Sequence, residues 1–234
     1  MARWPVVAVL LLGSAIAAVL VFRQAPGPEA PRDRVVAAAI PDSERLSIVA
    51  FGTSLTQRAI WPERLGVALR DCGFREAAVT VRARPGAGSA EGLALIGSDA
   101  ARPRHLALIE FAINDADLVD GVSRGTSLAN HRAMIAALRA RHPGIAVLLV
   151  TTNPVAGLQR LKRPKLMAYD DLYQRLAGEM GASLFDGAAR WVATPGWQDA
   201  LPDGLHPEPE VEAALYTRPL AGMVARIFGR TCPG

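Results

Sequence analysis

The segment Leu46-Ser-Ile-Val-Ala-Phe-Gly-Thr-Ser-Leu-Thr56 joins a short apolar run to a turn that contains Gly52 and Ser54. The β-branched and aromatic residues of the run predict a buried strand. A glycine with small neighbours directly after such a strand allows a tight turn that points a serine hydroxyl outward. Ser54 is therefore a candidate nucleophile at the carboxyl end of the first strand.

Beyond this segment, short apolar runs alternate with stretches of helical periodicity. We expect strands at 46–51, 77–82, 106–113, 146–152 and 182–185, and helices around 61–72, 89–101, 126–141, 164–180 and 209–228. Gly73, Gly144 and Gly181 stand between a helix and the next strand, where a left-handed residue commonly ends the helix. Because parallel strands require crossovers, this alternation predicts a three-layer α/β/α domain with a mostly parallel, five-stranded sheet of flavodoxin-like type.

The ends of the predicted strands bring small and polar residues to one edge of the sheet. The residues that follow these strand ends are Ser54, Gly88, Asn114 and Asn153. Open α/β sheets bind their ligands at the carboxyl ends of the strands. We therefore expect the functional site at this edge.

The segment Asp203-Gly-Leu-His-Pro207, near the C-terminus, supplies a candidate acid–base pair. Asp203 stands three residues before His206, close enough for its carboxylate to hold the Nδ1–H of the imidazole. The Nε2 atom would then be free to accept a proton from a serine hydroxyl. Together with Ser54, this pair suggests a serine hydrolase.

Two further segments extend the pattern, Val81-Arg-Ala-Arg-Pro-Gly-Ala-Gly-Ser-Ala90 and Glu110-Phe-Ala-Ile-Asn-Asp115. With the Ser54 and His206 segments, their order resembles that of the SGNH hydrolases, also called GDSL esterases, over about residues 45–230. The resemblance implies that His206 is the base and Asp203 its orienting acid. It also implies an oxyanion hole that is built from the backbone N–H groups of Ser54 and Gly88 and the side-chain amide of Asn114.

The chain departs from the usual family pattern at three positions. Thr53 replaces the aspartate of Gly-Asp-Ser-Leu, Ala83 stands where the family often has asparagine, and Ala112 stands where it often has glycine. None of these positions belongs to the catalytic triad. We expect the changes to affect loop packing and the pocket wall more than the chemistry.

The resemblance implies a serine esterase that works through an acyl-enzyme and needs no metal or organic cofactor. Small residues near the site, among them Gly52, Ala87 and Ala112, favour a short acyl group such as acetyl. Two alternatives stay open at this point. One is an SGNH-type O-acetyltransferase that acts on an exported polysaccharide, and the other is an inactive carbohydrate-binding SGNH module.

The N-terminus differs in composition from the rest of the chain. Residues 5–22 carry no charge, Arg3 and Arg23 flank them, and residues 24–43 are rich in proline. The apolar run is long for a cleaved signal peptide and near the lower limit for a membrane span. We therefore expect a signal-anchor at 1–23, a linker at 24–43 and a hydrolase domain at 44–234. The domain would be periplasmic or extracellular and held at a membrane, with a cleaved, secreted form as the alternative.

The charge of the chain gives no sign of a nucleic-acid partner. The formal net charge is +4, and residues 35–234 contain 22 basic and 20 acidic residues. The one local basic cluster is Arg160, Lys162, Arg163 and Lys165, which we interpret as a solvated loop before a helix. The expected partner is an ester of a small molecule or a polysaccharide, and nothing in the sequence indicates an oligomeric state.

The remaining polar and sulfur-containing residues have no clear catalytic pattern. His105, His131 and His142 are expected at helix surfaces or the start of a strand, and Asp170 and Asp171 on different sides of a helix. A charged residue within an apolar strand needs a partner, so Glu110 is expected either to brace the loops near Ser54 and Asn114 or to lie at a strand edge. The two cysteines, Cys72 and Cys232, form either a disulfide or two buried thiols.

Overall fold

The computed structural model describes residues 30–41, 44–99 and 103–233, and within these ranges it forms a three-layer α/β/α domain. The strands are β1 (Arg45–Gly52), β2 (Glu76–Ala83), β3 (Leu106–Ile109), β4 (Ala146–Thr151) and β5 (Ser183–Asp186). They pair in parallel in the order β2-β1-β3-β4-β5. The predicted five-stranded sheet and its parallel pairing are therefore confirmed.

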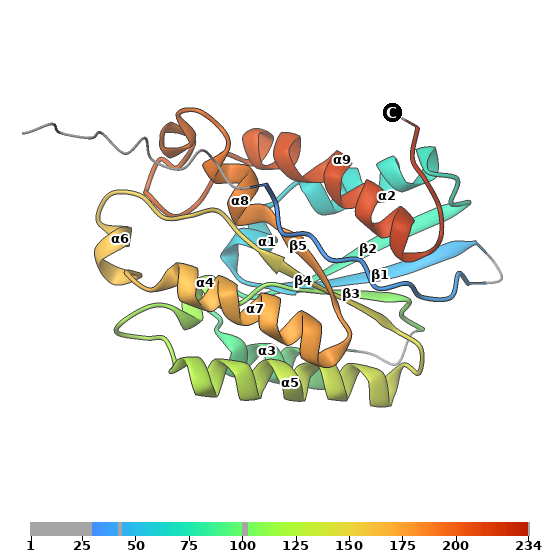
Figure 1. Cartoon of the computed structure of the whole chain (residues 1–234), viewed down its shortest axis with the longest axis horizontal. Coiled ribbons are helices and arrows are strands. Elements are labelled where there is room, and N and C mark those ends of the chain that lie inside the picture. Colours follow the sequence, from blue (N-terminus) through green and yellow to red (C-terminus); the bar gives the residue numbers. More distant parts are fainter. Residues whose placement is uncertain (1–29, 42–43, 100–102, 234) are drawn as a thin grey trace, which may run out of the picture.

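Helices cover both faces of the sheet (Figure 1). The long helices are α2 (Trp61–Asp71), α3 (Ser89–Ser98), α5 (Arg124–Arg141), α7 (Leu166–Met180) and α9 (Pro209–Ile227). Successive residues of a strand point to opposite faces, so Ile48 packs with α2 and α9 while Val49 packs with α5 and α7. Two apolar cores result, one on each side of the sheet.

The third strand is shorter than we predicted. It ends at Ile109, and residues Ala112–Asp115 form the short helix α4 instead of continuing the expected strand to 113. The backbone N–H of Phe111 donates to the Tyr173 hydroxyl at 2.8 Å, so this amide bonds to a side chain and not to a neighbouring strand. Several short elements were also not predicted, because a single turn is too short to show a period. They are α1 (Ser54–Arg58), α6 (Gln159–Lys162), α8 (Gly187–Val192) and the 3₁₀ helix η1 (Trp197–Ala200).

The glycines that were expected to end helices do so. Gly73, Gly144 and Gly181 have φ angles of 86°, 85° and 55°. Residues with a side chain rarely adopt this left-handed conformation. The three glycines thus turn the chain from a helix toward the next strand, as the sequence predicts.

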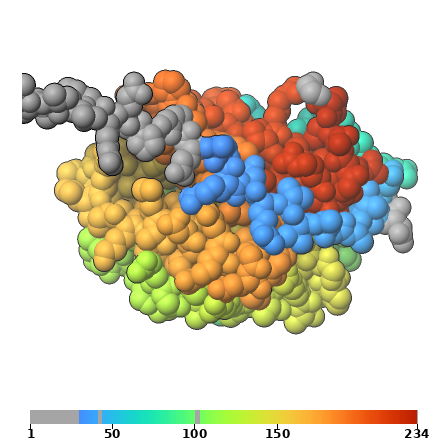
Figure 2. All heavy atoms as spheres, in the orientation of Figure 1, coloured from blue at the N-terminus to red at the C-terminus, as the bar shows by residue number. Residues whose placement is uncertain are grey.

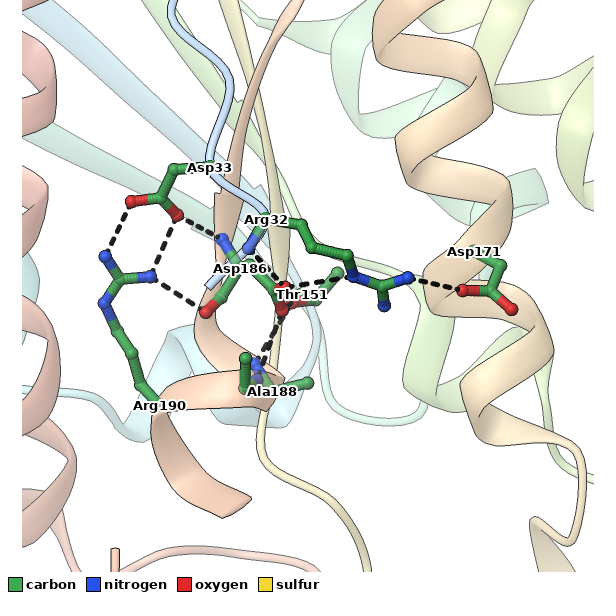
Figure 3. Close-up of polar contacts among 8 residues, drawn as sticks. Arg32, Asp33, Thr151, Asp171, Asp186, Ala188 and Arg190 are labelled. Atoms are coloured by element: carbon green, nitrogen blue, oxygen red, sulfur yellow. Dashed lines mark hydrogen bonds and ion pairs between the residues drawn. The ribbon is translucent and has the colours of Figure 1, made fainter. Parts of the chain in front are cut away.

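Residues 30–41, which we expected to belong to a linker, lie along the domain between α7 and α9 (Figure 2). The backbone of Arg34 exchanges two 2.9 Å hydrogen bonds with Leu184, which covers part of the free edge of β5. Asp33 forms an ion pair of 2.7 Å with Arg190, and its carboxylate accepts a hydrogen bond from the Asp186 backbone (Figure 3). The described part of the expected linker is therefore packed against the sheet.

A disulfide joins Cys72, at the end of α2, to Cys232 in the C-terminal tail after α9. The sequence left open whether these cysteines form a disulfide or two buried thiols, and the structure contains the disulfide. The tail is held beside it by an ion pair of 2.6 Å between Arg230 and Glu44. The bridge therefore closes a loop with a sequence separation of 160 residues.

The predicted signal-anchor at residues 1–23 lies outside the described residues. Among the residues that the structure describes, no helix is both long enough and apolar enough to cross a membrane. The membrane-anchoring segment therefore stays a prediction.

Candidate active site

The predicted site residues meet at the carboxyl edge of the sheet. Ser54 is the first residue of α1, directly after β1, and Gly88 is the residue that caps the start of α3 after β2. Asn114 lies in α4, directly after β3. Asp203 and His206 come from the loop between η1 and α9. The topology thus brings segments that are 152 residues apart into contact.

Ser54, His206 and Asp203 form a continuous chain of hydrogen bonds. The Ser54 Oγ atom lies 2.8 Å from His206 Nε2, and His206 Nδ1 lies 2.6 Å from Asp203 Oδ2. Because the carboxylate accepts from Nδ1–H, Nε2 is left to accept from the serine hydroxyl. This is the arrangement that a serine nucleophile, its base and an orienting acid require.

Asp203 is held in its ionised form. Partial burial works against ionisation, but the backbone and ring N–H groups of His206 and the backbone N–H of Leu205 donate to its carboxylate. Together these hydrogen bonds lower the pKa of Asp203 to about 2. The carboxylate can therefore stabilise a positive charge on His206 over the whole neutral range.

The turn that carries Ser54 is braced by Glu110. The Glu110 Oε2 atom accepts hydrogen bonds from the Thr53 backbone N–H, the Thr53 hydroxyl and the Thr56 hydroxyl, at 2.9 to 3.0 Å. The turn is so close-packed that a Cβ at Gly52 would lie 2.1 Å from Thr56 Oγ1, so a glycine is required there. Of the two expectations for Glu110, bracing the Ser54 loop is the one that the structure supports.

Asn153, at the end of β4, holds the loop that contains His206. Its side-chain amide donates to the backbone oxygen of Leu205 at 2.8 Å. The Ala156 backbone N–H donates to the oxygen of Gly204, also at 2.8 Å. The residues after β4 thus position the histidine, a role that the sequence pattern did not reveal beyond placing Asn153 at this edge.

The side chain of Asn114 faces the segment that contains Gly88. Its Nδ2 donates to the backbone oxygen of Ala87 at 2.9 Å, and the second N–H of the same amide remains available to a ligand. The neighbouring Asp115 accepts from the Ser89 backbone N–H at 2.7 Å. These two contacts fix α4 against the start of α3, so Asn114 and Gly88 keep a constant relative position.

The Gly88 backbone N–H already has a partner. It donates to the carboxylate of Glu91, three residues later in the first turn of α3, at 3.0 Å. An oxyanion that bound to this N–H would compete with the Glu91 carboxylate. The predicted role of Gly88 therefore requires Glu91 to move or to share the donor.

Arg163 is not the solvated loop residue that we expected. Its side chain is 7% exposed and pairs with Asp117 at 3.0 Å. Its Nε donates to the Ile113 backbone oxygen at 2.8 Å, and its guanidinium also reaches the side-chain oxygen of Asn114 at 3.4 Å. Arg163 also donates to the side chain of Gln159 at 2.5 Å. The sequence pattern did not identify Arg163 as buried, because its contacts with Ile113 and Asp117 join it to a segment 46 to 50 residues away in the chain.

His131 was also expected on a helix surface, and that expectation is wrong. The ring is buried, with Nε2 2.8 Å from the Tyr173 hydroxyl and Nδ1 2.7 Å from the Ser127 backbone oxygen. Burial lowers its pKa, so the ring serves as a neutral link between α5 and α7. Asp170 is buried while Asp171 pairs with Arg32 at the surface, in agreement with their expected separation.

A cavity of about 720 Å³ opens beyond β4 and β5. Val155, Arg163, Asp170 and Trp197 are among the residues that line it, whereas Ser54 and His206 are not. The cavity therefore adjoins the Asn153 and Arg163 segments without containing the candidate nucleophile.

Comparison with solved structures finds the same fold in several acylhydrolases. A lipase/acylhydrolase from Enterococcus faecalis is 23% identical, with a TM-score of 0.66 over 76% of this chain and 96% of that one. An acetylxylan esterase from Geobacillus stearothermophilus is 18% identical, with a TM-score of 0.63 over 81% and 96%. A carbohydrate acetylesterase from Sinorhizobium meliloti is 19% identical, with a TM-score of 0.62 over 78% and 100%.

Comparison of the sequence gives two results. None of the curated proteins compared with the chain matches it significantly. The sequence profile of the GDSL-like lipase/acylhydrolase family matches residues 47–214, a range that includes Ser54, Asp203 and His206. The chain therefore belongs to the GDSL-like lipase/acylhydrolase family, the SGNH hydrolases, and is a carboxylic ester hydrolase.

Proposed function

We propose that the chain is an exported serine esterase that removes short acyl groups, acetyl first among them, from carbohydrate esters. The observation that carries the proposal is the hydrogen-bonded chain from Ser54 Oγ through His206 to Asp203, with distances of 2.8 and 2.6 Å. Membership in an acylhydrolase family gives the same reaction class.

In the first half of the reaction, Ser54 Oγ attacks the ester carbonyl carbon while His206 Nε2 takes the hydroxyl proton. The carbonyl oxygen gains a negative charge, and the amide of Asn114 and the backbone N–H of Ser54 are the donors proposed to stabilise it. The tetrahedral intermediate then collapses. His206 gives its proton to the leaving alkoxide, the ester C–O bond breaks, and the acyl group remains on Ser54.

In the second half, a water molecule replaces the alcohol. His206 Nε2 takes a proton from the water, the resulting hydroxide oxygen attacks the acyl carbon, and the proton returns to Ser54 Oγ as the acid leaves. The ionised Asp203 favours the imidazolium in both halves, and its contact with Nδ1 keeps the ring in the productive tautomer. Proton transfer and charge stabilisation thus come from residues of this chain.

The preference for a short acyl group is supported by the small size of the residues that flank the proposed oxyanion donors. Ala87 and Ala112, which stand beside Gly88 and Asn114 in the chain, are buried residues with small side chains. Two of the similar structures are an acetylxylan esterase and a carbohydrate acetylesterase. We therefore propose acetylated sugars as the substrate class.

Export of the domain is supported by two independent features. Residues 5–22 form an uncharged apolar run, and Cys72 and Cys232 form a disulfide, a bond that is rare in reducing compartments. We propose that the apolar run is retained as an anchor. The short connection between it and Arg32, where the described chain already contacts the domain, would keep the enzyme close to the membrane surface.

The proposal is tested by labelling and product analysis. Wild-type protein should react with a fluorophosphonate at Ser54 and release acetate from acetylated xylo-oligosaccharides and nitrophenyl acetate. Ser54→Ala should do neither, whereas Ser98→Ala, an exposed serine whose hydroxyl bonds only to its own helix, should match the wild type. Absence of labelling and of acetate release in the wild type would refute the esterase proposal. Transfer of the acetyl group to an added sugar in preference to water would show that the enzyme is an acetyltransferase instead.

A further inference from the structure

A very small cavity lies beneath the turn that carries Ser54. Its volume is about 10 Å³, roughly what one water molecule needs. Most of its lining is apolar and comes from β1, β3, β4, α1, α2 and α9. Two carboxyl groups, those of Glu110 and Glu212, also line it. A cavity of this size with two acids in an apolar wall calls for a polar occupant.

Glu110 uses only one of its two carboxyl oxygens for contacts with the protein. The Oε2 atom accepts the three hydrogen bonds from Thr53 and Thr56 described above, whereas the buried Oε1 atom has no hydrogen-bond partner. Glu110 is 4% exposed, so bulk water does not satisfy this oxygen. A water in the cavity would give Oε1 the partner that a buried polar atom requires.

Glu212 approaches the cavity from α9 and is 3% exposed. No cation is among the residues that line the cavity. The charge of Asp115 disfavours ionisation of Glu110, and a charge on Glu110 in turn raises the pKa of Asp170, Tyr173 and Tyr216. Two carboxylates in such surroundings cannot both be ionised without a large penalty.

The protonation of both groups follows from these surroundings. Burial raises the pKa of Glu110 to about 7, although its hydrogen bonds from Thr53 and Thr56 favour the carboxylate. Burial and then the charge of Glu110 raise the pKa of Glu212 to about 8. Near neutral pH, at least one of the two carboxyls therefore keeps its proton.

We propose that Glu110 and Glu212 hold one water in this cavity as an acid–carboxylate pair, and that this unit fixes the turn that presents Ser54. Glu110 is then a positioning residue that acts through Thr53 and Thr56. Thr53 supplies two of the three donors, and its hydroxyl occurs at the position where the family's usual aspartate would bring another negative charge. The positioning role rests on the proposed esterase function, whereas the acid pair itself does not.

The pair makes a specific prediction for the dependence of stability on pH. In the unfolded chain the two carboxyls release their protons near pH 4.5. In the folded chain Glu110 keeps its proton until about pH 7 and Glu212 until about pH 8. The folded state thus binds more protons in this window, and stability decreases as the pH rises through it. Glu212→Gln removes one of these protons and the repulsion between the two charges. The difference between the melting temperature of Glu212→Gln and that of wild type should therefore increase steadily from about pH 4.5 to about pH 8 and then stay constant.

The experiment measures melting curves from pH 4 to 10 and ester kinetics for the full-length wild type, Glu212→Gln, Glu110→Gln and Glu110→Ala. Glu110→Ala should lower kcat by about 10- to 100-fold with little change in KM, because the serine turn loses its brace. Glu110→Gln keeps an oxygen for the same three donors and should restore kcat. Asp170→Asn, which changes a buried carboxyl that does not contact the turn, should leave kcat unchanged.

Two results would overturn the inference. If the melting temperatures of Glu212→Gln and wild type run parallel across the whole pH range, the two acids do not share a proton. Glu110 does not position the nucleophile through these hydrogen bonds if Glu110→Ala folds and keeps the kcat of wild type. The same conclusion follows if kcat falls as far in Glu110→Gln as in Glu110→Ala. Failure of the esterase proposal is distinguishable, because wild type itself would then not react with a fluorophosphonate, while the melting test would still apply.

Discussion

Removal of the disulfide should lower the stability of the protein strongly without changing its catalysis. Cys72 lies just before β2, at the amino edge of the sheet, whereas Ser54 follows the carboxyl end of β1. The eight residues of β1 separate these two edges by about 25 Å. Replacing both cysteines with alanine should therefore leave the contacts of Ser54, His206 and Asp203 as they are.

The size of the effect follows from the loop that the bridge closes. For a separation of 160 residues, the loss of chain entropy in the unfolded state is worth about 5 kcal/mol as an upper value, and about 2–4 kcal/mol is typical. In a domain of this size, each kcal/mol shifts the melting temperature by about 2–4 °C. We expect the Cys72→Ala, Cys232→Ala variant to melt roughly 10 °C below wild type.

The assay compares melting curves and kcat at 25 °C for wild type, wild type with reductant, and the double variant. The Arg230–Glu44 ion pair and the contact of Arg230 with the face of Phe74 at 5.0 Å remain in all three, so the tail should stay in place in the folded state. Reductant should not affect the variant, which provides the control. A melting temperature equal to that of wild type, or two free thiols in the untreated, denatured protein, would refute the reasoning. So would a loss of activity at temperatures where the variant is folded.

Three further predictions concern the site and the N-terminus. Ser54→Ala and His206→Ala should each abolish nearly all hydrolysis, and the double variant should be little worse than either, because the two groups act as one unit. Asp203→Asn should cause a smaller loss of activity. If the losses of the two single variants add up in the Ser54, His206 double variant, the two residues do not act as one unit. Asn114→Ala should fold normally and lose roughly 10²–10³ in kcat, the usual effect of one oxyanion donor; a normal kcat with a lower melting temperature would show that Asn114 has only a structural role. Mass analysis of the membrane fraction should find residues 5–22 in the mature protein, and a mature chain that begins after them would rule out the anchor.

The local pattern of the sequence was sufficient to predict the fold and the catalytic candidates. Apolar runs and helical periodicity are properties of neighbouring residues, so the five strands and the long helices could be placed within a few residues. Ser54, Gly88, Asn114, Asp203 and His206 lie in short segments whose order along the chain resembles one family. Glycines such as Gly181 indicate the end of a helix in the sequence, because glycine readily adopts the left-handed conformation that this position requires.

The supports of the site depend on residues that are distant in the sequence. The sequence suggested that Arg163 is a solvated cation, yet it pairs with Asp117 and bonds to the backbone of Ile113 in α4. Asn153 holds the His206 loop across 52 residues. Whether Glu110 would brace a loop or lie at a strand edge was decided only when β1 and β3 became neighbours. Glu212 had no visible role until α9 packed over the same strands. A sequence records which side chains are present, but the burial and the partners of a charge depend on the packing of distant elements, and these set its energy.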